Sequence, residues 1–278
     1  MKPGEPFLSA CLTVGYRNKP AVLRSVFLQM RHGEVLGLVG QSGSGKSTLA
    51  LSLLRLLDSG RAEGTVYFQG TDLMRLKERE LRQIRGKDIG LVLQSPLTSL
   101  NPALRIGTQL AEAWRAHACG SSEDCKRSLL AALASVSLPA ENEFLQRYPS
   151  QLSVGQAQRV LIAMAVLHRP SLLIADEATS ALDVITQSEV LALFAQLNRD
   201  MGMGILYISH DLLSVASICH RIAILQEGEI VECAPTAEIF GCPTHPYTQK
   251  LIAALPEKPA VAEARAGRSR RPLMASLR

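Results

Sequence analysis

The stretch Gly40–Ser47 constrains the fold of this chain more than any other part of its sequence. It reads GQSGSGKS, which fits the pattern GxxxxGK[ST], and it stands between the apolar run 34–39 and the leucine-rich segment 48–57. Glycines let a backbone wrap phosphate oxygens without a Cβ clash, and the N-terminus of a following helix adds positive potential. A strand, this loop and a helix therefore predict a site for the phosphates of a nucleotide.

The residue types of this loop indicate which parts of a nucleotide they contact. The Lys46 amine is expected to reach the β- and γ-phosphates, and the Ser47 hydroxyl is expected to bind Mg²⁺. ATP and Mg²⁺ are therefore the predicted cofactors. The predicted nucleotide-binding residues of this segment are Gly40, Gln41, Ser42, Gly43, Ser44, Gly45, Lys46, Ser47 and Thr48.

A second apolar run, 172–175, ends in the two carboxylates Asp176 and Glu177. Phosphoryl transfer depends on positioning and charge neutralisation more than on covalent chemistry, so two acids beside one metal ion suffice. We expect Asp176 to hold Mg²⁺ through water, and Glu177 to orient or deprotonate the attacking water. Alone, such a string also fits a strand that meets solvent. Together with the phosphate loop it predicts a catalytic edge.

The order of the apolar runs predicts the fold class. Short β-type runs separated by turn signals come first and indicate an antiparallel layer. Later buried-strand runs, each followed by a helical stretch, are typical of a mostly parallel sheet with helices on its faces. The predicted fold is α/β, a P-loop NTPase with a mostly parallel core sheet, an N-terminal antiparallel β layer and a helical subdomain at about residues 95–165. The runs concerned are 8–14, 22–30 and 65–68 for the antiparallel layer, 89–93, 172–175 and 204–208 for the core sheet, 109–117 and 124–136 for the helices, and 222–225 with 229–232 for a late hairpin.

Composition and charge exclude several classes of protein. The chain of 278 residues is 47% apolar, and its apolar run 160–167 is far shorter than the roughly 20 residues that cross a bilayer. The N-terminus lacks the pattern of a secretory signal, and the six cysteines contain no CxxC pair, so we expect a cytoplasmic chain with reduced thiols. Of the net charge of +5, residues 257–278 carry six basic minus two acidic side chains, or +4. The basicity thus belongs to a C-terminal tail that we expect to be disordered, and no nucleic-acid partner is predicted.

The segment Leu152–Gln156 reads LSVGQ and precedes the acidic strand. It resembles the LSGGQ signature of the ATP-binding cassette (ABC) ATPases, and further motifs follow in that family's order over about residues 8–256. The resemblance implies that Tyr16 stacks on adenine, that Gln94 senses Mg²⁺ and contacts a membrane subunit, and that His210 is the switch histidine. It implies catalytic roles for Glu177, His210 and Gln94, metal binding by Ser47, Gln94 and Asp176, and further nucleotide contacts by Ser153, Gly155, Gln156 and Asp183.

The same resemblance implies a dimer. In that family the signature closes over ATP bound to a second subunit, so hydrolysis requires a head-to-tail pair of cassettes, either homodimeric or heterodimeric. Two positions depart from the family pattern: Val154 replaces a glycine of the signature, and Ala178 replaces the proline that usually follows the catalytic glutamate. Three interpretations are open: an active site with a modified signature, one impaired site in an asymmetric heterodimer, or a regulatory subunit that does not hydrolyse ATP.

Two further strings resemble one branch of the family. Ser95–Pro102 reads SPLTSLNP and His245–Leu251 reads HPYTQKL, as in ATPase subunits of oligopeptide, dipeptide and nickel importers. This resemblance implies an ABC domain over residues 1–256 at the cytoplasmic face of the inner membrane, with transmembrane permease subunits and an extracytoplasmic solute-binding protein as partners. The main alternative is an ABC ATPase of a cytosolic complex such as phosphonate carbon–phosphorus lyase, which closely resembles this branch.

Overall fold

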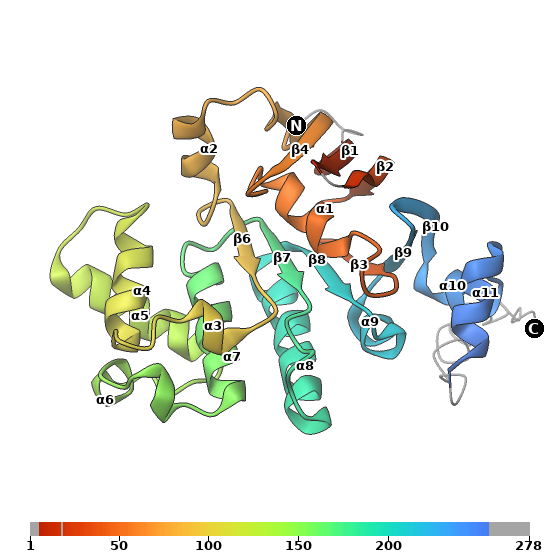
Figure 1. Ribbon diagram of the computed structural model, residues 1–278. Helices are drawn as coiled ribbons and strands as arrows, with labels where there is room; N and C mark the ends of the chain where they lie inside the picture. The colour runs from red at the N-terminus through yellow and green to blue at the C-terminus, as the bar shows by residue number, and fades with distance from the viewer. Residues whose placement is uncertain (1–5, 18, 256–278) are drawn as a thin grey trace, which may run out of the picture.

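The computed structural model describes residues 6–17 and 19–255, so the predicted tail at 257–278 lies outside the described residues. Two β-sheets form the centre of the described chain, and helices surround them (Figure 1). Within the described ranges, every helix is too short or too polar to cross a membrane.

The antiparallel sheet contains four strands in the order β2-β1-β4-β5. Its strands are β1 (Leu8–Tyr16), β2 (Lys19–Met30), β4 (Gly60–Phe68) and β5 (Thr71–Asp72). Alternate residues of β1, among them Leu8, Ala10 and Leu12, are buried, as expected of a strand with one face on the core. The predicted antiparallel layer is confirmed. The prediction missed the first half of β4, because Gly60 and Gly64 disfavour strands in local sequence terms, whereas pairing with β1 overrides that preference.

The core sheet contains six strands in the order β10-β9-β3-β8-β7-β6. They are β3 (Val35–Val39), β6 (Ile89–Val92), β7 (Leu172–Asp176), β8 (Gly204–Ser209), β9 (Arg221–Gln226) and β10 (Glu229–Pro235). All neighbouring pairs are parallel except β9 and β10, which form the predicted hairpin. Every residue of β3, β7 and β8 is buried, so the mostly parallel sheet predicted from their apolar runs is confirmed.

Helices cover both faces of the core sheet or form the helical subdomain, which gathers at the lower left of Figure 1. The subdomain comprises α3 (Pro96–Ser99), α4 (Ile106–Arg115), α5 (Ser122–Ser135), α6 (Asn142–Leu145), a 3₁₀ turn (Pro149–Gln151) and α7 (Val154–Val166). The other helices are α1 (Lys46–Leu53), α2 (Glu78–Ile84), α8 (Val184–Met201), α9 (Leu212–Ile218), α10 (Thr236–Gly241) and α11 (Pro246–Ala253).

Helix α1 differs from its prediction at both ends. It begins at Lys46, two residues earlier than expected, because Gly45 takes a left-handed conformation with φ 106° and turns the chain into the helix. It ends at Leu53 rather than at residue 57, since Arg55 also adopts a positive φ and its guanidinium donates to the Leu73 and Leu76 carbonyls.

The core sheet separates two apolar clusters. Side chains of successive strand residues point to opposite faces, so Ile205 and Tyr207 of β8 lie in one cluster with the helical subdomain, whereas Leu206 and Ile208 lie in the other with α1 and the antiparallel sheet. Burial on both faces fixes the register of the strands. It therefore also fixes where the loops at their carboxyl ends begin.

Glu232 of β10 attaches α11 to the core sheet. Its carboxylate accepts hydrogen bonds from the Thr244 amide at 2.9 Å, the Thr244 hydroxyl at 2.9 Å and the His245 amide at 3.0 Å. His245 in turn caps α11 by accepting from the Tyr247 amide. Burial raises the pKa of Glu232, but the hydrogen bonds outweigh it and leave the pKa below its ordinary value of 4.5.

Replacing Glu232 should therefore destabilise the fold in a pH-dependent way. We expect Glu232→Ala to lower the free energy of unfolding by about 1–3 kcal/mol at pH 7, because charge-assisted hydrogen bonds are lost. Since the folded pKa is depressed, this contribution exists above pH 4.5 and disappears as the pH falls through the folded value. Denaturant titrations at pH 7 and at progressively lower pH measure the difference. The control is Glu229→Ala, because Glu229 on the same strand makes a 3.8 Å ion pair with both side chains more than half exposed, which contributes little. An equal loss in both variants would contradict the assignment.

Candidate functional site

The site lies where the carboxyl ends of the parallel strands meet. Val39 pairs with Ser209, and Asp176 pairs with Ile208, so β3, β7 and β8 end at the same edge. The segments that follow these strands carry Lys46, Glu177 and His210, and Gln94 follows β6. Sequence positions as distant as 46 and 210 thus come together, as predicted for this type of sheet.

The loop Gly40–Ser47 is shaped by backbone geometry that favours glycine. Gly43 and Gly45 have φ of 80° and 106°, in the left-handed region. A Cβ at Gly40 would stand 2.2 Å from the Leu225 carbonyl oxygen, so no larger residue fits there. The loop leads into α1, which has no side-chain cap hydrogen bond at its N-terminus, and the free amides of a helix N-terminus suit anion binding.

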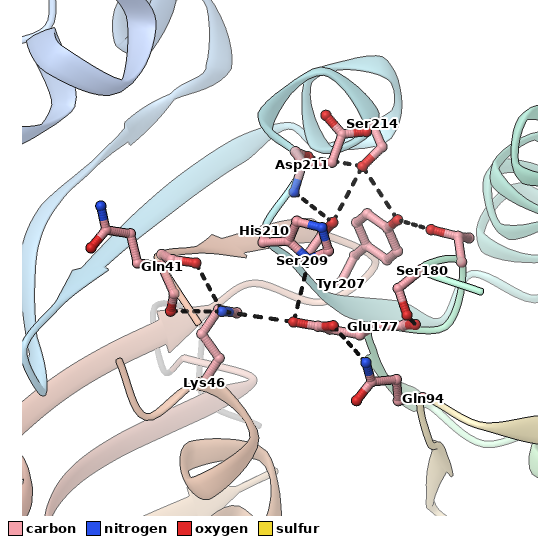
Figure 2. Close-up of polar contacts among 12 residues, drawn as sticks. Gln41, Lys46, Gln94, Glu177, Ser180, Tyr207, Ser209, His210, Asp211 and Ser214 are labelled. Carbon is pink, nitrogen blue, oxygen red and sulfur yellow. Dashed lines mark hydrogen bonds and ion pairs between the residues drawn. The ribbon is translucent and has the colours of Figure 1, made fainter. Parts of the chain in front are cut away.

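Lys46 lies inside this loop and is only 4% exposed. Its Nζ donates to the Gly40 carbonyl at 2.8 Å and to the Gln41 carbonyl at 3.1 Å, and it lies 3.8 Å from Oε1 of Glu177 (Figure 2). Burial lowers the pKa of Lys46, and the charges of Glu177 and Asp176 oppose that shift. The amine is therefore held by two loop carbonyls, with the Glu177 carboxylate as the negative group beside it.

Asp176 ends β7 and is 5% exposed. Burial raises the pKa of this carboxyl, Glu177 adds to the rise, and a hydrogen bond from Ser47 and the charge of Lys46 act against it. Within residues 6–17 and 19–255, its Oδ1 has no hydrogen-bond partner. A buried carboxylate oxygen left unpaired beside a serine hydroxyl is a donor set that suits a hard cation such as Mg²⁺.

Glu177 stands at the centre of the polar contacts in Figure 2. Its Oε2 accepts from Gln94 Nε2 at 2.9 Å, and its Oε1 lies 3.5 Å from His210 Nδ1. The residue has a φ of 47°, an uncommon conformation for a side chain other than glycine, and its amide donates to the Ile208 carbonyl at 2.9 Å. The backbone of β8 therefore fixes where this carboxylate points.

Two helix N-termini carry the remaining predicted polar residues. Ser153 caps α7, because its hydroxyl accepts from the Gln156 amide at 3.2 Å while Gln156 Oε1 accepts from the Ser153 amide at 3.1 Å. Asp183 caps α8 by accepting from the Ile185 and Thr186 amides. No hydrogen bond or ion pair between described residues joins either cap to the loop 40–47.

Tyr16 also stands apart from the other predicted residues. It ends β1 opposite Gly60, and a Cβ at Gly60 would meet its ring at 2.9 Å. The structure thus brings together five of the predicted residues in one site: Lys46, Asp176, Glu177, Gln94 and His210. Tyr16, Ser153 and Asp183 lie outside this site.

Sequence reasoning missed several residues that hold this site. The Ser180 amide and hydroxyl donate to the Glu177 carbonyl at 3.1 and 3.0 Å, which stabilises its unusual backbone. The Tyr207 hydroxyl lies 2.8 Å from the Thr179 hydroxyl. A tyrosine inside an otherwise apolar strand was the available signal for that contact, since a buried hydroxyl requires a partner.

Comparison with known families agrees with this geometry. A protein-family model described as "ABC transporter" matches residues 23–180, more than half of the 278 residues. This chain belongs to the ABC transporter family. A second model, described as "Oligopeptide/dipeptide transporter, C-terminal region", matches residues 231–275 of this ABC chain, so the predicted oligopeptide and dipeptide branch is confirmed.

Two individual relatives match most of the length of this ABC chain. It is 43% identical over 243 residues to the glutathione import ATP-binding protein GsiA of Salmonella choleraesuis strain SC-B67, which covers 84% of this chain but 39% of the relative. It is 44% identical over 247 residues to YejF, an uncharacterized ABC transporter ATP-binding protein of Escherichia coli strain K12, covering 87% of this chain and 47% of the relative. The chain therefore spans less than half the length of these relatives.

Solved structures confirm the predicted fold class. A dimer of the ATP-binding cassette MJ0796 bound to ADP and Pi in a post-hydrolysis state superposes with a TM-score of 0.72 at 29% identity, covering 82% of this chain and 98% of that one. CbiO1 from Clostridium perfringens has the same fold, with a TM-score of 0.75 at 23% identity over 91% of this chain and 96% of its own.

Gly155 in the first turn of α7 packs closely against Thr186 in the first turn of α8, and its substitution tests this packing. A Cβ at this position would stand 2.6 Å from Cγ2 of Thr186, whose hydroxyl is held by Asp183 at 2.7 Å. Alanine is the better helix former, but the clash should outweigh that gain, so Gly155→Ala should lower the free energy of unfolding by about 1 kcal/mol. Chemical denaturation measures this change.

Two further variants make the Gly155 test specific. Thr186→Ser removes Cγ2 and keeps the hydroxyl, so Gly155→Ala in a Thr186→Ser background should no longer be destabilising. Val154→Ala, one residue away and 38% exposed, should change stability by less than about 0.5 kcal/mol. A destabilisation by Gly155→Ala that persists in the Thr186→Ser background would disprove the clash.

Proposed function

We propose that this chain is the ATP-binding and ATP-hydrolysing subunit of an ABC importer for peptides and powers uptake through membrane subunits. The observation that carries the proposal is the Glu177 carboxylate, which contacts Lys46, Gln94 and His210 at the carboxyl edge of the core sheet. The match of residues 231–275 to a transporter C-terminal region supports import. It favours this function over an ATPase of a cytosolic lyase complex.

In this proposal Glu177 is the general base that orients the attacking water and takes its proton. Gln94 and His210 hold its two carboxylate oxygens from opposite sides, at 2.9 and 3.5 Å. The direction of the Glu177 carboxylate is thereby set by neighbours on different loops. His210, whose side chain is half exposed, is the switch residue that meets the γ-phosphate.

Lys46 and the loop bind the triphosphate. The Nζ hydrogen bonds to the Gly40 and Gln41 carbonyls hold the amine inside the loop, where the β- and γ-phosphates replace Glu177 as its negative partner. The amides at the start of α1 and the residues Gly40–Thr48 supply the remaining contacts. Tyr16, at the end of β1, stacks on the adenine ring.

Mg²⁺ fits the donors present at this edge. The unpaired Asp176 Oδ1 and the Ser47 hydroxyl beside it would hold the ion, with Gln94 as the third protein group. When bound, the ion would neutralise phosphate charge and offset the repulsion between the buried Asp176 carboxylate and the phosphates. In this proposal Lys46 accordingly binds phosphate, Asp176 binds the metal ion, and Glu177 activates the attacking water.

Ser153, Gly155, Gln156 and Asp183 serve the nucleotide of a second cassette. Their position away from the loop 40–47 of the same chain supports this role, and the MJ0796 cassette is dimeric. Val154 is compatible with an active signature, because its side chain is 38% exposed while Ser153 still caps α7. Ala178 is buried, which supports a packing role for that position.

The partners in this proposal are a second ABC ATPase subunit, transmembrane permease subunits and an extracytoplasmic solute-binding protein. The chain lies at the cytoplasmic face of the inner membrane as a peripheral subunit. A peptide cargo is supported by the transporter C-terminal region and by the similarity to a relative named for glutathione import. Nickel is the alternative cargo, and only the strings at 95–102 and 245–251 support it.

A conservative change of the proposed base tests the hydrolytic function. Glu177→Gln keeps the hydrogen bond with Gln94 within reach but removes the proton acceptor, so kcat for ATP should fall by about 10²- to 10⁴-fold while ATP still binds. Phosphate release and binding of a fluorescent ATP analogue measure the two quantities. The matched control is Glu63→Gln on the antiparallel sheet, where the side chain is 63% exposed and only turnover equal to the unaltered protein is expected. Undiminished ATP turnover in Glu177→Gln would show that Glu177 is not the general base.

Affinity purification from membranes of the native host tests the transport function. An importer subunit should copurify with permease subunits, and the purified assembly should hydrolyse ATP faster when a loaded solute-binding protein is added. Recovery with soluble enzymes instead would overturn the importer proposal without affecting the ATPase assignment.

A further inference from the structure

Tyr207 lies in the middle of the buried core sheet and carries a hydroxyl group. Tyr207 is the fourth residue of β8, pairs with Gly37 and Ala175, and is fully buried, as are most of its neighbours on that strand. Its ring packs against Phe194 of α8 with centroids 6.0 Å apart. A phenylalanine would fill the same volume, so packing accounts for the ring but not for the hydroxyl, which is costly to bury without a partner.

The hydroxyl finds its partners on both sides of the catalytic edge. It lies 2.8 Å from Oγ1 of Thr179, which is 3% exposed, and 3.4 Å from Oγ of Ser214, which is 5% exposed (Figure 2). The Ser214 hydroxyl donates to the Asp211 carbonyl at 2.8 Å, and the Asp211 amide donates to the Ser209 hydroxyl at 3.0 Å. These hydroxyls and backbone groups are joined by consecutive hydrogen bonds, and we call this row of groups the hydroxyl chain.

The direction of the hydrogen bonds in this chain follows from proton counting. Each hydroxyl has one proton to donate, and that of Ser214 is used by the Asp211 carbonyl. Tyr207 therefore donates to Ser214, and Thr179 must donate to Tyr207. Burial raises the pKa of the Tyr207 hydroxyl, which keeps it protonated for this role. The order Thr179 to Tyr207 to Ser214 to Asp211 is thus fixed, and each bond polarises the next.

The two ends of the hydroxyl chain lie in the two loops that carry the proposed base Glu177 and the switch histidine His210. Thr179 is two residues after Glu177, and its carbonyl accepts from the Leu182 amide in the same turn. Ser209 and Asp211 flank His210. Asp211 is also held by Gln187 of α8 at 3.3 Å and caps α9, so its position is well defined. The side chains of Glu177 and His210 meet at 3.5 Å at one end of these loops, and the hydroxyl chain joins the loops inside the core.

The geometry points to Tyr207 as a positioning residue whose hydroxyl, through Thr179 and Ser214, holds the Glu177 loop and the His210 loop in a single arrangement. The inference rests on the proposed function, because it assigns the hydroxyl to aligning the base with the switch histidine. Tyr207 is fully buried, so it acts through the two loops rather than on the reacting groups. Displacements of catalytic groups by about 1 Å reduce turnover by up to about 100-fold, so the loss of one buried bond at this place is sufficient to be measured.

Removal of the hydroxyl alone tests the inference. Tyr207→Phe keeps the ring and should lower kcat for ATP by about 10- to 100-fold with KM and nucleotide affinity unchanged, since the phosphate loop is untouched. Thr179→Val breaks the same hydrogen bond from its other end and should have a similar effect. Each single variant should also lower the unfolding temperature, because it removes one hydrogen bond of a buried hydroxyl.

The double variant Tyr207→Phe with Thr179→Val separates positioning from stability. Replacing both partners by apolar groups of similar shape should restore the unfolding temperature, whereas kcat should stay low because the link between the loops is still missing. A kcat that recovers together with stability would overturn the inference, and so would a kcat for Tyr207→Phe within about twofold of the unaltered protein. The matched control is Thr236→Val, which removes a buried hydroxyl bonded to the Cys219 carbonyl at 2.6 Å, away from this edge, and should leave kcat unchanged.

The outcome is distinguishable from failure of the proposed function. If Glu177→Gln retains turnover, the base assignment fails whatever Tyr207 does. If Glu177→Gln abolishes turnover and Tyr207→Phe leaves kcat unchanged, the positioning role of Tyr207 alone is refuted.

Discussion

Three charged side chains are held close together at the buried carboxyl edge of the core sheet, and much of the structure depends on keeping them there. Lys46 is 4% exposed, Asp176 is 5% exposed, and Glu177 approaches Lys46 at 3.8 Å. Charges out of water are costly unless they are paired and hydrogen-bonded. The opposite shifts in pKa, down for Lys46 and up for Asp176, record that cost. A ligand that brings its own phosphates and cation would relieve both costs, in keeping with the nucleotide site proposed at this edge.

The apolar strands around this edge supply the rigidity that the charges require. Because β3, β7 and β8 are buried on both faces, a slip of one residue would move an entire row of side chains from one apolar cluster to the other. The register of these strands is therefore fixed by packing, and it determines the position at which each following loop begins. Glu177 adds a local constraint, because its positive φ persists only where Ser180 and the Ile208 carbonyl hold the turn.

The sequence predicted those parts of the molecule that depend on local pattern. The phosphate loop has a fixed spacing, and the fully buried strands are short apolar runs, so both could be located from residue order alone. Element ends were less predictable: α1 stops at Leu53 because Arg55 finds carbonyls at residues 73 and 76, a contact between distant segments. Predicted site residues such as Gln94 and His210 were placed by motif, while their distances from Glu177 required the packed sheet. The bond between Thr179 and Tyr207 was outside local reasoning, since it joins residues that only the pairing of β7 with β8 brings together.

The close packing of Gly155 on Thr186 has a mechanical consequence. Thr186 donates its hydroxyl to Asp183, and its methyl group lies 2.6 Å from where a Cβ of Gly155 would be, so the starts of α7 and α8 are in close contact. In the proposed head-to-tail pair of cassettes, the starts of both helices would face the nucleotide of the neighbouring chain. Loss of phosphate from that nucleotide would then act on α7 and α8 together, because the Gly155–Thr186 contact couples their first turns.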